Sequence, residues 1–391
     1  MDARTQSPTK LFEGGPPVRI QRLLGLIKPD RPMIGKRAVL CIAISWAPLA
    51  LLALVQALTQ QDAAALSFFS DFAVFARLIV AVPVLIFAET DCIPRLCRIA
   101  THFLEAGFVR DSDIGLYDRA VRSTRWLIES RLAEIATFIL AYAAALTLVR
   151  YVPLTDLPDW YRIGGEFPSI SPAGWWHGLV SMPLLLALLY GWFWRALLWG
   201  RFLWLMARLD LRLVPSHPDL YGGLHFVGTS LRAFRLLAFA FGAIVAGTMG
   251  NLVIHEGASF LEVRNVAIGL GVFVLALFVG PLLVFLRKLP ETKQRAVFEY
   301  GMLADKLGRE FEKKWMKSSH HVDEGALQAE DFSATTDLYQ VVSKVYQARV
   351  LPFGLREVVF LIIAAFLPFV PVALSVVPLG EILKQAAKFL L

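Results

Sequence analysis

Seven apolar stretches, each about 20 residues long, alternate with polar segments along the chain. An α-helix needs about 20 predominantly apolar residues to cross roughly 30 Å of hydrocarbon. Membrane β-barrels would instead give alternating segments of about 10 residues, so the pattern favours helices. We therefore expect an all-α, polytopic transmembrane protein with about seven spans. The expected spans are 38–58, 71–88, 132–152, a helix from 174 onwards, 231–254, 266–286 and 358–379.

Proline interrupts the last apolar stretch at Pro368, Pro371 and Pro378. Because proline lacks a backbone N–H and its ring kinks a helix, two courses are open for this segment. It either crosses once as a kinked helix, or it re-enters as a hairpin that returns Lys384 and Lys388 to the side from which it started. We favour the single crossing.

Lysine and arginine gather in alternate segments between the expected spans. They concentrate in 1–37, 91–131, 207–230 and 287–355, whereas the loops 59–70, 153–173 and 255–264 carry at most one each. The positive-inside rule then places the amino terminus and segment 287–355 in the cytoplasm. The net charge of +7 is explained by this anchoring and by contact with anionic lipids, so we expect membrane lipids and no nucleic acid as partners.

The pattern divides the chain into four parts. They are a cytoplasmic tail (1–37), a six-span transmembrane domain (38–286) with cytoplasmic loops 91–131 and 207–230, a cytoplasmic helical segment (287–355), and a C-terminal membrane segment (356–391). In the third part, 291–317 and 331–346 have apolar residues at helical spacing. Two such helices bury little core alone. We expect them to pack on the cytoplasmic ends of the spans, on the extended fourth helix, or on a neighbouring subunit.

Composition supports the membrane setting and indicates no cofactor or catalytic site. A mean hydropathy of +0.57 is far above that of soluble domains. The three cysteines, Cys41, Cys92 and Cys97, predict no disulfide framework and no metal site. No glycine-rich nucleotide loop or catalytic triad is recognisable. We expect no cofactor and lean towards a protein that is not an enzyme.

The most pointed local sequence lies between the fourth and fifth spans, where His217, Asp219, Gly222, Gly223 and His225 fall within nine residues. As a functional loop, the glycines would let backbone amides approach an anion, with the other three residues as ligands or proton carriers. As a turn, Pro218 would set φ, the aspartate would cap, and the glycines would allow close packing. We favour the turn and keep the ligand or gating role open.

Ionisable residues inside apolar runs are costly and often functional. Arg77 in the second span and Arg195 in the fourth helix are candidates for lining a path, as is Asn251 in the fifth span. The fourth helix is expected to continue beyond the hydrocarbon. In the loop between the fifth and sixth spans, His255 and Glu256 are either a surface pair or an external pH sensor.

Two short sequences resemble a group of uncharacterised bacterial inner-membrane proteins with several spans. They are the loop His217-Pro-Asp-x-x-Gly-Gly-Leu224 and the junction Leu351-Pro-Phe353, which leads into Leu367-Pro-Phe-Val-Pro371. The similarity covers the carboxy-terminal half. The resemblance implies a location in a bacterial inner membrane, and it implies no particular activity. This chain has His225 where the group often has glycine.

We expect a homo-oligomeric channel or transport-type protein for ions or a small solute, with a preference for anions because of the intramembrane arginines. One alternative is an enzyme that acts on a lipid or lipid-linked substrate at the cytoplasmic interface, with His217 and Asp219 as an acid–base pair. Another is a scaffold or signalling protein that recruits a partner through residues 291–350.

Overall fold

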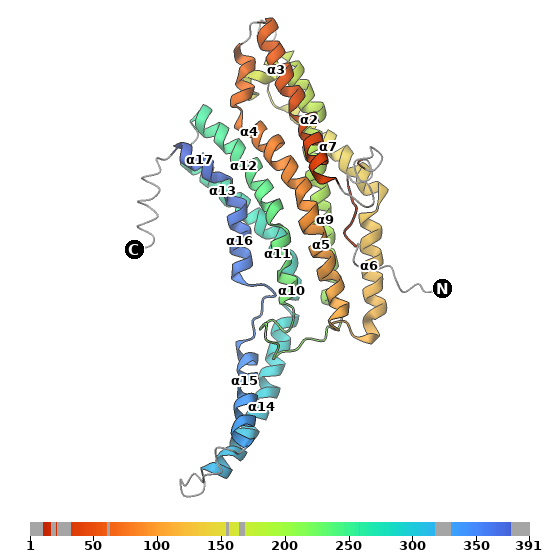
Figure 1. Cartoon of the computed structure of the whole chain (residues 1–391), viewed down its shortest axis with the longest axis vertical. Helices are drawn as coiled ribbons and strands as arrows, with labels where there is room; N and C mark the ends of the chain where they lie inside the picture. Colours follow the sequence, from red (N-terminus) through yellow and green to blue (C-terminus); the bar gives the residue numbers. More distant parts are fainter. Residues whose placement is uncertain are drawn as a thin grey trace, which may run out of the picture.

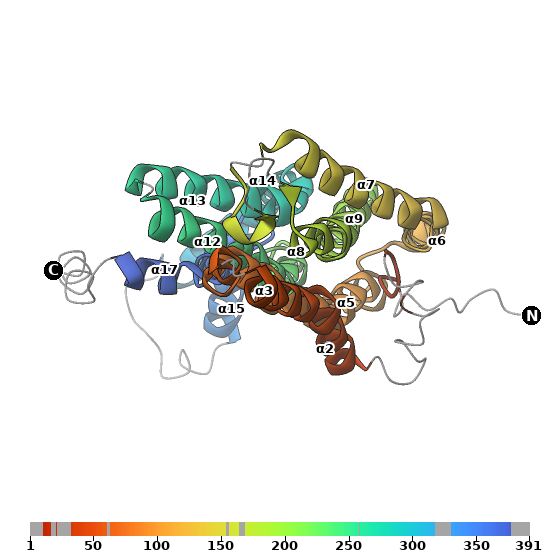
Figure 2. The same ribbon diagram turned by 90° about the horizontal axis from the view of Figure 1, so that it is seen from above.

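The computed structural model describes residues 11–16, 21, 33–60, 63–153, 156–163, 169–257, 259–316 and 330–376. Within these residues the fold is almost entirely helical. The one sheet in this part of the chain is a two-stranded antiparallel pair, β1 (Arg162–Ile163) and β2 (Ser169–Ile170). The long helices run side by side along the long axis of the molecule, and a helical hairpin projects from one end (Figure 1). Seen from above, they form one bundle (Figure 2).

Five helical stretches in the described part of the chain are long and apolar enough to cross a membrane. A sixth is obtained if two helices that meet at 43°, Asp111–Ile128 and Arg131–Thr147, are counted as one span. The five are Ile34–Thr59, Phe72–Glu105, Pro172–Arg208, His225–His255 and Leu261–Trp315. These helices fit a multi-pass membrane protein.

In the amino-terminal half, the first two apolar stretches form longer helices than the pattern suggested, and the third has about the expected length. Its elements are α2 (Ile34–Ser45), α3 (Ala47–Gln60), η2 (Ala63–Ser70), α4 (Phe72–Phe75), the π-helical η3 (Ala76–Ala81), α5 (Val82–Glu105), η4 (Asp111–Asp113), α6 (Ile114–Ile128) and α7 (Arg131–Tyr151). The helix expected to end near residue 88 continues to Glu105.

The middle of the chain supplies the two central helices of the bundle. Its elements are η6 (Asp159–Tyr161), α8 (Pro172–Trp176), the π-helical η7 (His177–Ser181), α9 (Met182–Arg208), α10 (His225–Gly228), α11 (Ser230–Ala233) and α12 (Arg235–Glu256). The expected continuation of the fourth helix is present, because α9 runs on to Arg208.

The hairpin that projects from the bundle is formed by α14 (Lys288–Trp315) and α15 (Glu330–Gln347), which α13 (Phe260–Val274), η8 (Leu275–Val279) and η9 (Gly280–Phe285) precede. The two helices pack mainly on each other, with Phe332 in ring contact with Phe311 and Trp315 at 5.0 Å each. Of the expected packing partners, the membrane helices contribute little within the described residues, and packing on a neighbouring subunit stays a prediction. Only part of the apolar face of α14 is covered by α15, since Phe298, Met302 and Leu303 stay exposed, and the hairpin points away from the bundle (Figure 1).

The final apolar stretch forms α16 (Leu355–Phe366) and α17 (Phe369–Val376), separated by a turn at Leu367 and Pro368. Proline thus breaks the helix where the sequence suggested. Residues 377–391, with Lys384 and Lys388, lie outside the described residues, as do most of residues 1–32.

Close backbone contact fixes α12 between its neighbours. A Cβ on Gly242 would lie 1.9 Å from the carbonyl oxygen of Ala365 in α16, and one on Gly247 would lie 2.3 Å from the Cβ of Ala76 in η3. Small residues allow such approach where lipid gives helices little hydrophobic reason to associate.

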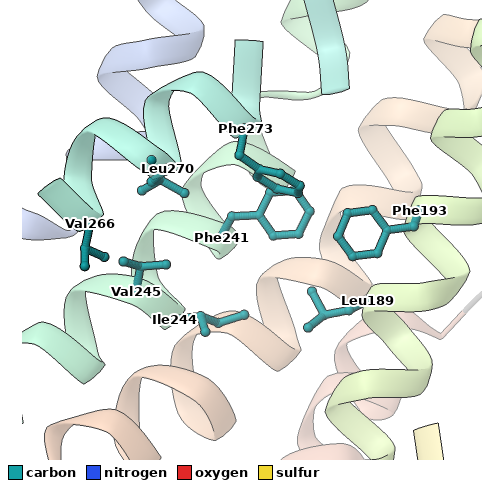
Figure 3. Close-up of a pocket in the computed structure, with 9 residues that line it drawn as sticks. Leu189, Phe193, Phe241, Ile244, Val245, Val266, Leu270 and Phe273 are labelled. Carbon is teal, nitrogen blue, oxygen red and sulfur yellow. The ribbon is translucent and has the colours of Figure 1, made fainter. Parts of the chain in front are cut away.

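An apolar groove lies between α9, α12 and α13, with a volume of about 330 Å³. The rings of Phe193, Phe241 and Phe273 pack together along it, and aliphatic side chains complete the walls (Figure 3). Its lining contains no charged side chain, so it suits hydrocarbon and not a polar ligand.

The contact of α12 with α16 makes a stability prediction. Gly242→Ala should lower the thermal unfolding temperature of the detergent-purified protein, because overpacking a tight contact costs about 1–3 kcal/mol. Gly269→Ala is the matched control, since a Cβ there meets nothing within 4 Å and alanine favours helix by roughly 1 kcal/mol. Equal unfolding temperatures for the two variants would contradict the contact.

Candidate functional site

Asp71 organises a polar site at the end of the bundle opposite the hairpin. It caps α4, where its Oδ1 accepts a hydrogen bond from the Val74 backbone N–H (3.0 Å). The same oxygen accepts from Asn251 Nδ2 (2.7 Å), and Oδ2 accepts from Trp160 Nε1 (2.8 Å). The carboxylate is buried. Three segments far apart in sequence therefore meet on one side chain.

Asn251 completes the link between α12 and α4. Its Oδ1 accepts from the Phe72 backbone N–H (2.8 Å) while its Nδ2 donates to Asp71. The two glycines that precede it by one turn or less, Gly247 and Gly250, let the helices approach closely enough for both bonds. The amide is thus a positioning group as well as part of a polar surface.

A polar pocket of about 540 Å³ opens beside this pair. Three aspartates line it against one arginine, and His255 stands at its edge, exposed. Asp159 pairs with that arginine, Arg162, at 2.6 Å. The full lining is Ser67, Ser70, Asp71, Asp156, Leu157, Pro158, Asp159, Trp160, Arg162, Asn251 and His255.

Arg77 lies about one and a half helical turns from Asp71, in the π-helical turn η3. Its Nη2 donates to Thr248 Oγ1 (2.9 Å), and that hydroxyl donates in turn to the Ile244 carbonyl (3.0 Å). π-helical turns are uncommon and are frequent at functional sites. The guanidinium is held between α12 and its own helix, next to the polar pocket and not in its lining.

His177 begins a second π-helical turn, η7, and is buried. Its ring packs edge-on against Trp160 (5.6 Å) and Tyr161 (5.5 Å). Neither ring nitrogen has a hydrogen-bond partner among the described residues, although a buried polar group without a partner is costly. Trp160 therefore touches both the pocket, which it lines, and this imidazole behind it.

The His217 loop lies near the junction of the bundle and the hairpin, and Asp219 holds it together. Oδ1 accepts from the backbone amides of Tyr221 (2.8 Å) and Gly223 (3.1 Å), and Oδ2 accepts from that of His225 (3.1 Å). His217 Nδ1 lies 2.9 Å from the same Oδ1. The amides expected to face an external anion are turned towards the carboxylate of the loop itself.

Three positions of this loop, Leu220, Gly222 and Gly223, have positive backbone φ angles of 65°, 63° and 92°. At Gly223 a Cβ would also lie 2.7 Å from the Phe108 ring. Glycine is needed there for both conformation and space.

The loop also contacts the segment that joins α15 to α16. The Arg349 backbone N–H donates to the Leu220 carbonyl (2.7 Å), and its Nη1 donates to the Tyr221 hydroxyl (3.0 Å). A Cβ on Gly228 would lie 2.6 Å from the Pro352 carbonyl oxygen. The chain segments that contain the two motifs of the resemblance thus contact each other.

Arg195 belongs to a third polar group, which is buried between α2, α5 and α9. Its Nη2 lies 3.6 Å from Glu89 Oε1, while Arg37 Nη2 lies 2.8 Å from Glu89 Oε2. Within the described residues, Arg195 therefore has one ion partner, Glu89 of α5, which it shares with Arg37 of α2. The side chain of Glu256 lies outside the described residues.

Sequence reasoning missed Glu89, Arg37, Trp160 and His177. A histidine between Trp176 and Gly178 near the start of a long apolar helix was a usable signal for the last of these. Among the described residues, no group of three histidine, cysteine or acidic side chains could hold a metal ion. No family model, no curated protein and no solved structure matches the chain.

Burial alone would raise the pKa of the Asp219 carboxyl, but the three backbone amides and the His217 imidazole hold that pKa below its ordinary value. A lowered pKa in the fold means that these bonds stabilise the loop above the unfolded pKa of about 3.9. That stability is lost as the pH falls through the lower folded value.

We therefore predict that the amides of 221–225 keep their hydrogen-exchange protection between pH 7 and about pH 5 and lose it only below about pH 4. Asp219→Asn should lose protection throughout this range, because a neutral amide accepts backbone hydrogen bonds less strongly. Mass spectrometry of the loop peptide after exchange, corrected for intrinsic rates, measures both. Protection that falls already between pH 7 and pH 5 would contradict the assignment.

Proposed function

We propose that the chain is a channel or transport-type membrane protein whose permeant ion or small solute enters through the polar pocket beside Asp71. The pocket itself carries the proposal: about 540 Å³ of largely polar space at the ends of membrane-length helices. Ligand sites are concave and have a few convergent polar groups. Asp71 and Asn251 provide such groups here.

Partly and fully buried polar groups continue inwards from the pocket and support a path. Arg77 and Thr248 lie on facing helices one to two turns further in, and His177 lies behind Trp160. Ionisable residues at membrane depth commonly mark ion and substrate paths. The two π-helical turns that carry Arg77 and His177 are further support, because such turns occur at functional sites more often than elsewhere.

The charges at the pocket favour cations at the point of entry. Three aspartates line it against a single arginine, and one of the aspartates is paired with that arginine. Rings of acidic side chains select cations in channels. The anion preference expected from Arg77 and Arg195 therefore has less support, since Arg195 is already engaged with Glu89.

We further propose the orientation expected from the charge pattern. The amino terminus and the α14–α15 hairpin would lie in the cytoplasm of a bacterium, and the pocket would open on the other side of the inner membrane. In this arrangement α16 and α17 together make the seventh span. Copies of the chain would meet through the hairpin, on which Phe298, Met302 and Leu303 are exposed.

The alternative of an enzyme that uses Asp219 as an acid or base has less support. Its two carboxylate oxygens already accept three backbone hydrogen bonds. A general base needs an oxygen within reach of a substrate proton, and these bonds hold the carboxylate in a structural role.

Ion flux through reconstituted protein tests the transport proposal. Wild-type protein in liposomes should conduct with a cation preference, and Asp71→Asn should lower both the flux and the preference, because it removes a buried negative charge from the entrance. We expect a decrease of about tenfold, typical of losing a charge-assisted interaction. Reversal potentials in a salt gradient measure the preference.

Asp305→Asn is the matched control, since Asp305 is exposed on the hairpin with 76% of its side chain accessible. It should conduct like wild type. Absence of any ion flux in wild-type protein would contradict the transport proposal. Wild-type flux and preference in a correctly folded Asp71→Asn variant would contradict the role of Asp71.

Cysteine labelling tests the orientation and the oligomer together. Phe298→Cys on the hairpin should react with a membrane-impermeant maleimide only in opened cells, whereas Ala63→Cys near the pocket should react in intact cells. Both positions are exposed. Under mild oxidation, Phe298→Cys should also form a disulfide-linked dimer. Labelling of Phe298→Cys in intact cells would reverse the orientation, and a monomer after oxidation would argue against contact through the hairpin.

A further inference from the structure

The short segment Leu11–Pro16 is inserted between helices of the bundle. Leu11 is 1% exposed and Phe12 is 0% exposed. The Phe12 ring packs edge-on against Trp199 (5.6 Å) and Phe202 (6.4 Å) of α9, and its backbone N–H donates to Cys97 Sγ of α5 (3.4 Å). The segment therefore fills a preformed aromatic site two residues before it reaches a buried cation.

That cation is Arg195, and it belongs to a group with more positive than negative charge. Arg37 and Arg195 share the single carboxylate of Glu89, at 2.8 Å and 3.6 Å. The two guanidinium groups are nearly inaccessible, at 3% and 2% of their side chains. Arg37 Nη2 also donates to Gln21 Oε1. The Nε of Arg37 has no hydrogen-bond partner among the described residues. Buried charge that is not fully paired is expensive.

A backbone oxygen supplies the missing acceptor. Arg195 Nε and Nη2 both donate to the Gly14 carbonyl, at 3.1 Å and 2.9 Å. Gly14 has φ of 116°, a conformation that favours glycine. The Nε and Nη2 groups that converge on this one oxygen are also donors with which arginine binds the two oxygens of a phosphate or carboxylate group. A neutral carbonyl stands where an anionic oxygen would bind more strongly.

With Pro172 placed at one surface of the membrane, the length of α8–α9 puts Arg195 at the level of the phospholipid headgroups on the other side. Arg195 lies 23 residues after Pro172, where its membrane-length helix begins, which is roughly 34 Å at 1.5 Å per residue. That length slightly exceeds the roughly 30 Å of the hydrocarbon core. The aromatic site of Phe12 lies further along α9, at Trp199 and Phe202, and offers an apolar surface next to the cation.

We propose that Arg195 and Arg37 form a binding site for the phosphate of an anionic phospholipid, and that segment 11–16 closes this site with the Gly14 carbonyl. The segment supplies the oxygen acceptor that a lipid phosphate would replace, and the Phe12 contacts hold it in place. Release of the segment opens the site to lipid. This site is separate from the pocket beside Asp71 and does not depend on the transport proposal.

Full-length variants test the site. Leu11→Ser/Phe12→Ser removes the apolar contacts that hold the segment, and should make Cys97, now 2% exposed, react with a maleimide. Binding of short-chain phosphatidylglycerol, measured by native mass spectrometry in detergent, should then increase by about tenfold or more over wild type. Adding Arg195→Gln should abolish the increase, and adding Arg195→Lys should restore only part of it, because lysine lacks the fork.

Leu355→Ala is the control, since Leu355 is 75% exposed at the start of α16, and it should bind lipid like wild type. Unfolding temperatures show that each variant is folded. Reactive Cys97 without an increase in lipid binding overturns the site, as does an increase that survives Arg195→Gln. Cys97 that stays protected in the double variant overturns the role of the segment. Inorganic phosphate that displaces the lipid at equal concentration overturns the choice of a lipid over a free anion.

Discussion

The close approach of α12 to its neighbours is the constraint on which the rest of the structure depends. With glycine at 242 and 247, the α12 backbone lies against α16 on one face and against η3 on another. In a membrane, helices gain from van der Waals contact and polar bonds where they cannot gain from burying apolar surface. Any larger residue at these positions would separate the helices and pull Asn251 away from Asp71.

The polar groups inside the bundle follow from that packing. Asp71 is satisfied by donors from α4, α12 and η6, and Glu89 by arginines from α2 and α9. Each carboxylate joins segments that are distant in the chain. A group of this kind costs little when every partner is present and much when one is removed. The same bonds therefore specify which helices pair.

Sequence periodicity predicted the apolar helices, because the composition of a membrane helix is a local property. The residue types predicted the turn at His217 and the break at Pro368, because proline, glycine and aspartate affect the backbone within a few residues. The apolar pattern placed the end of the second span near residue 88, because charged residues begin at Glu89. The helix continues to Glu105, and Glu89 is accommodated within the bundle because arginines from two other helices pair with its carboxylate. Such distant partners leave no periodic signal. His177 escaped notice for the same reason, since its neighbours Trp160 and Tyr161 come from a loop.

The α14 helix has a mechanical consequence. Its 28 residues form a rod about 42 Å long, and α13, η8 and η9 connect its first turn to the membrane region. A rotation of 5° at that root displaces the far tip sideways by roughly 4 Å, by the geometry of a rod of this length. Small rearrangements among tightly packed spans are therefore amplified into a displacement that another molecule can sense, without any change inside the hairpin itself.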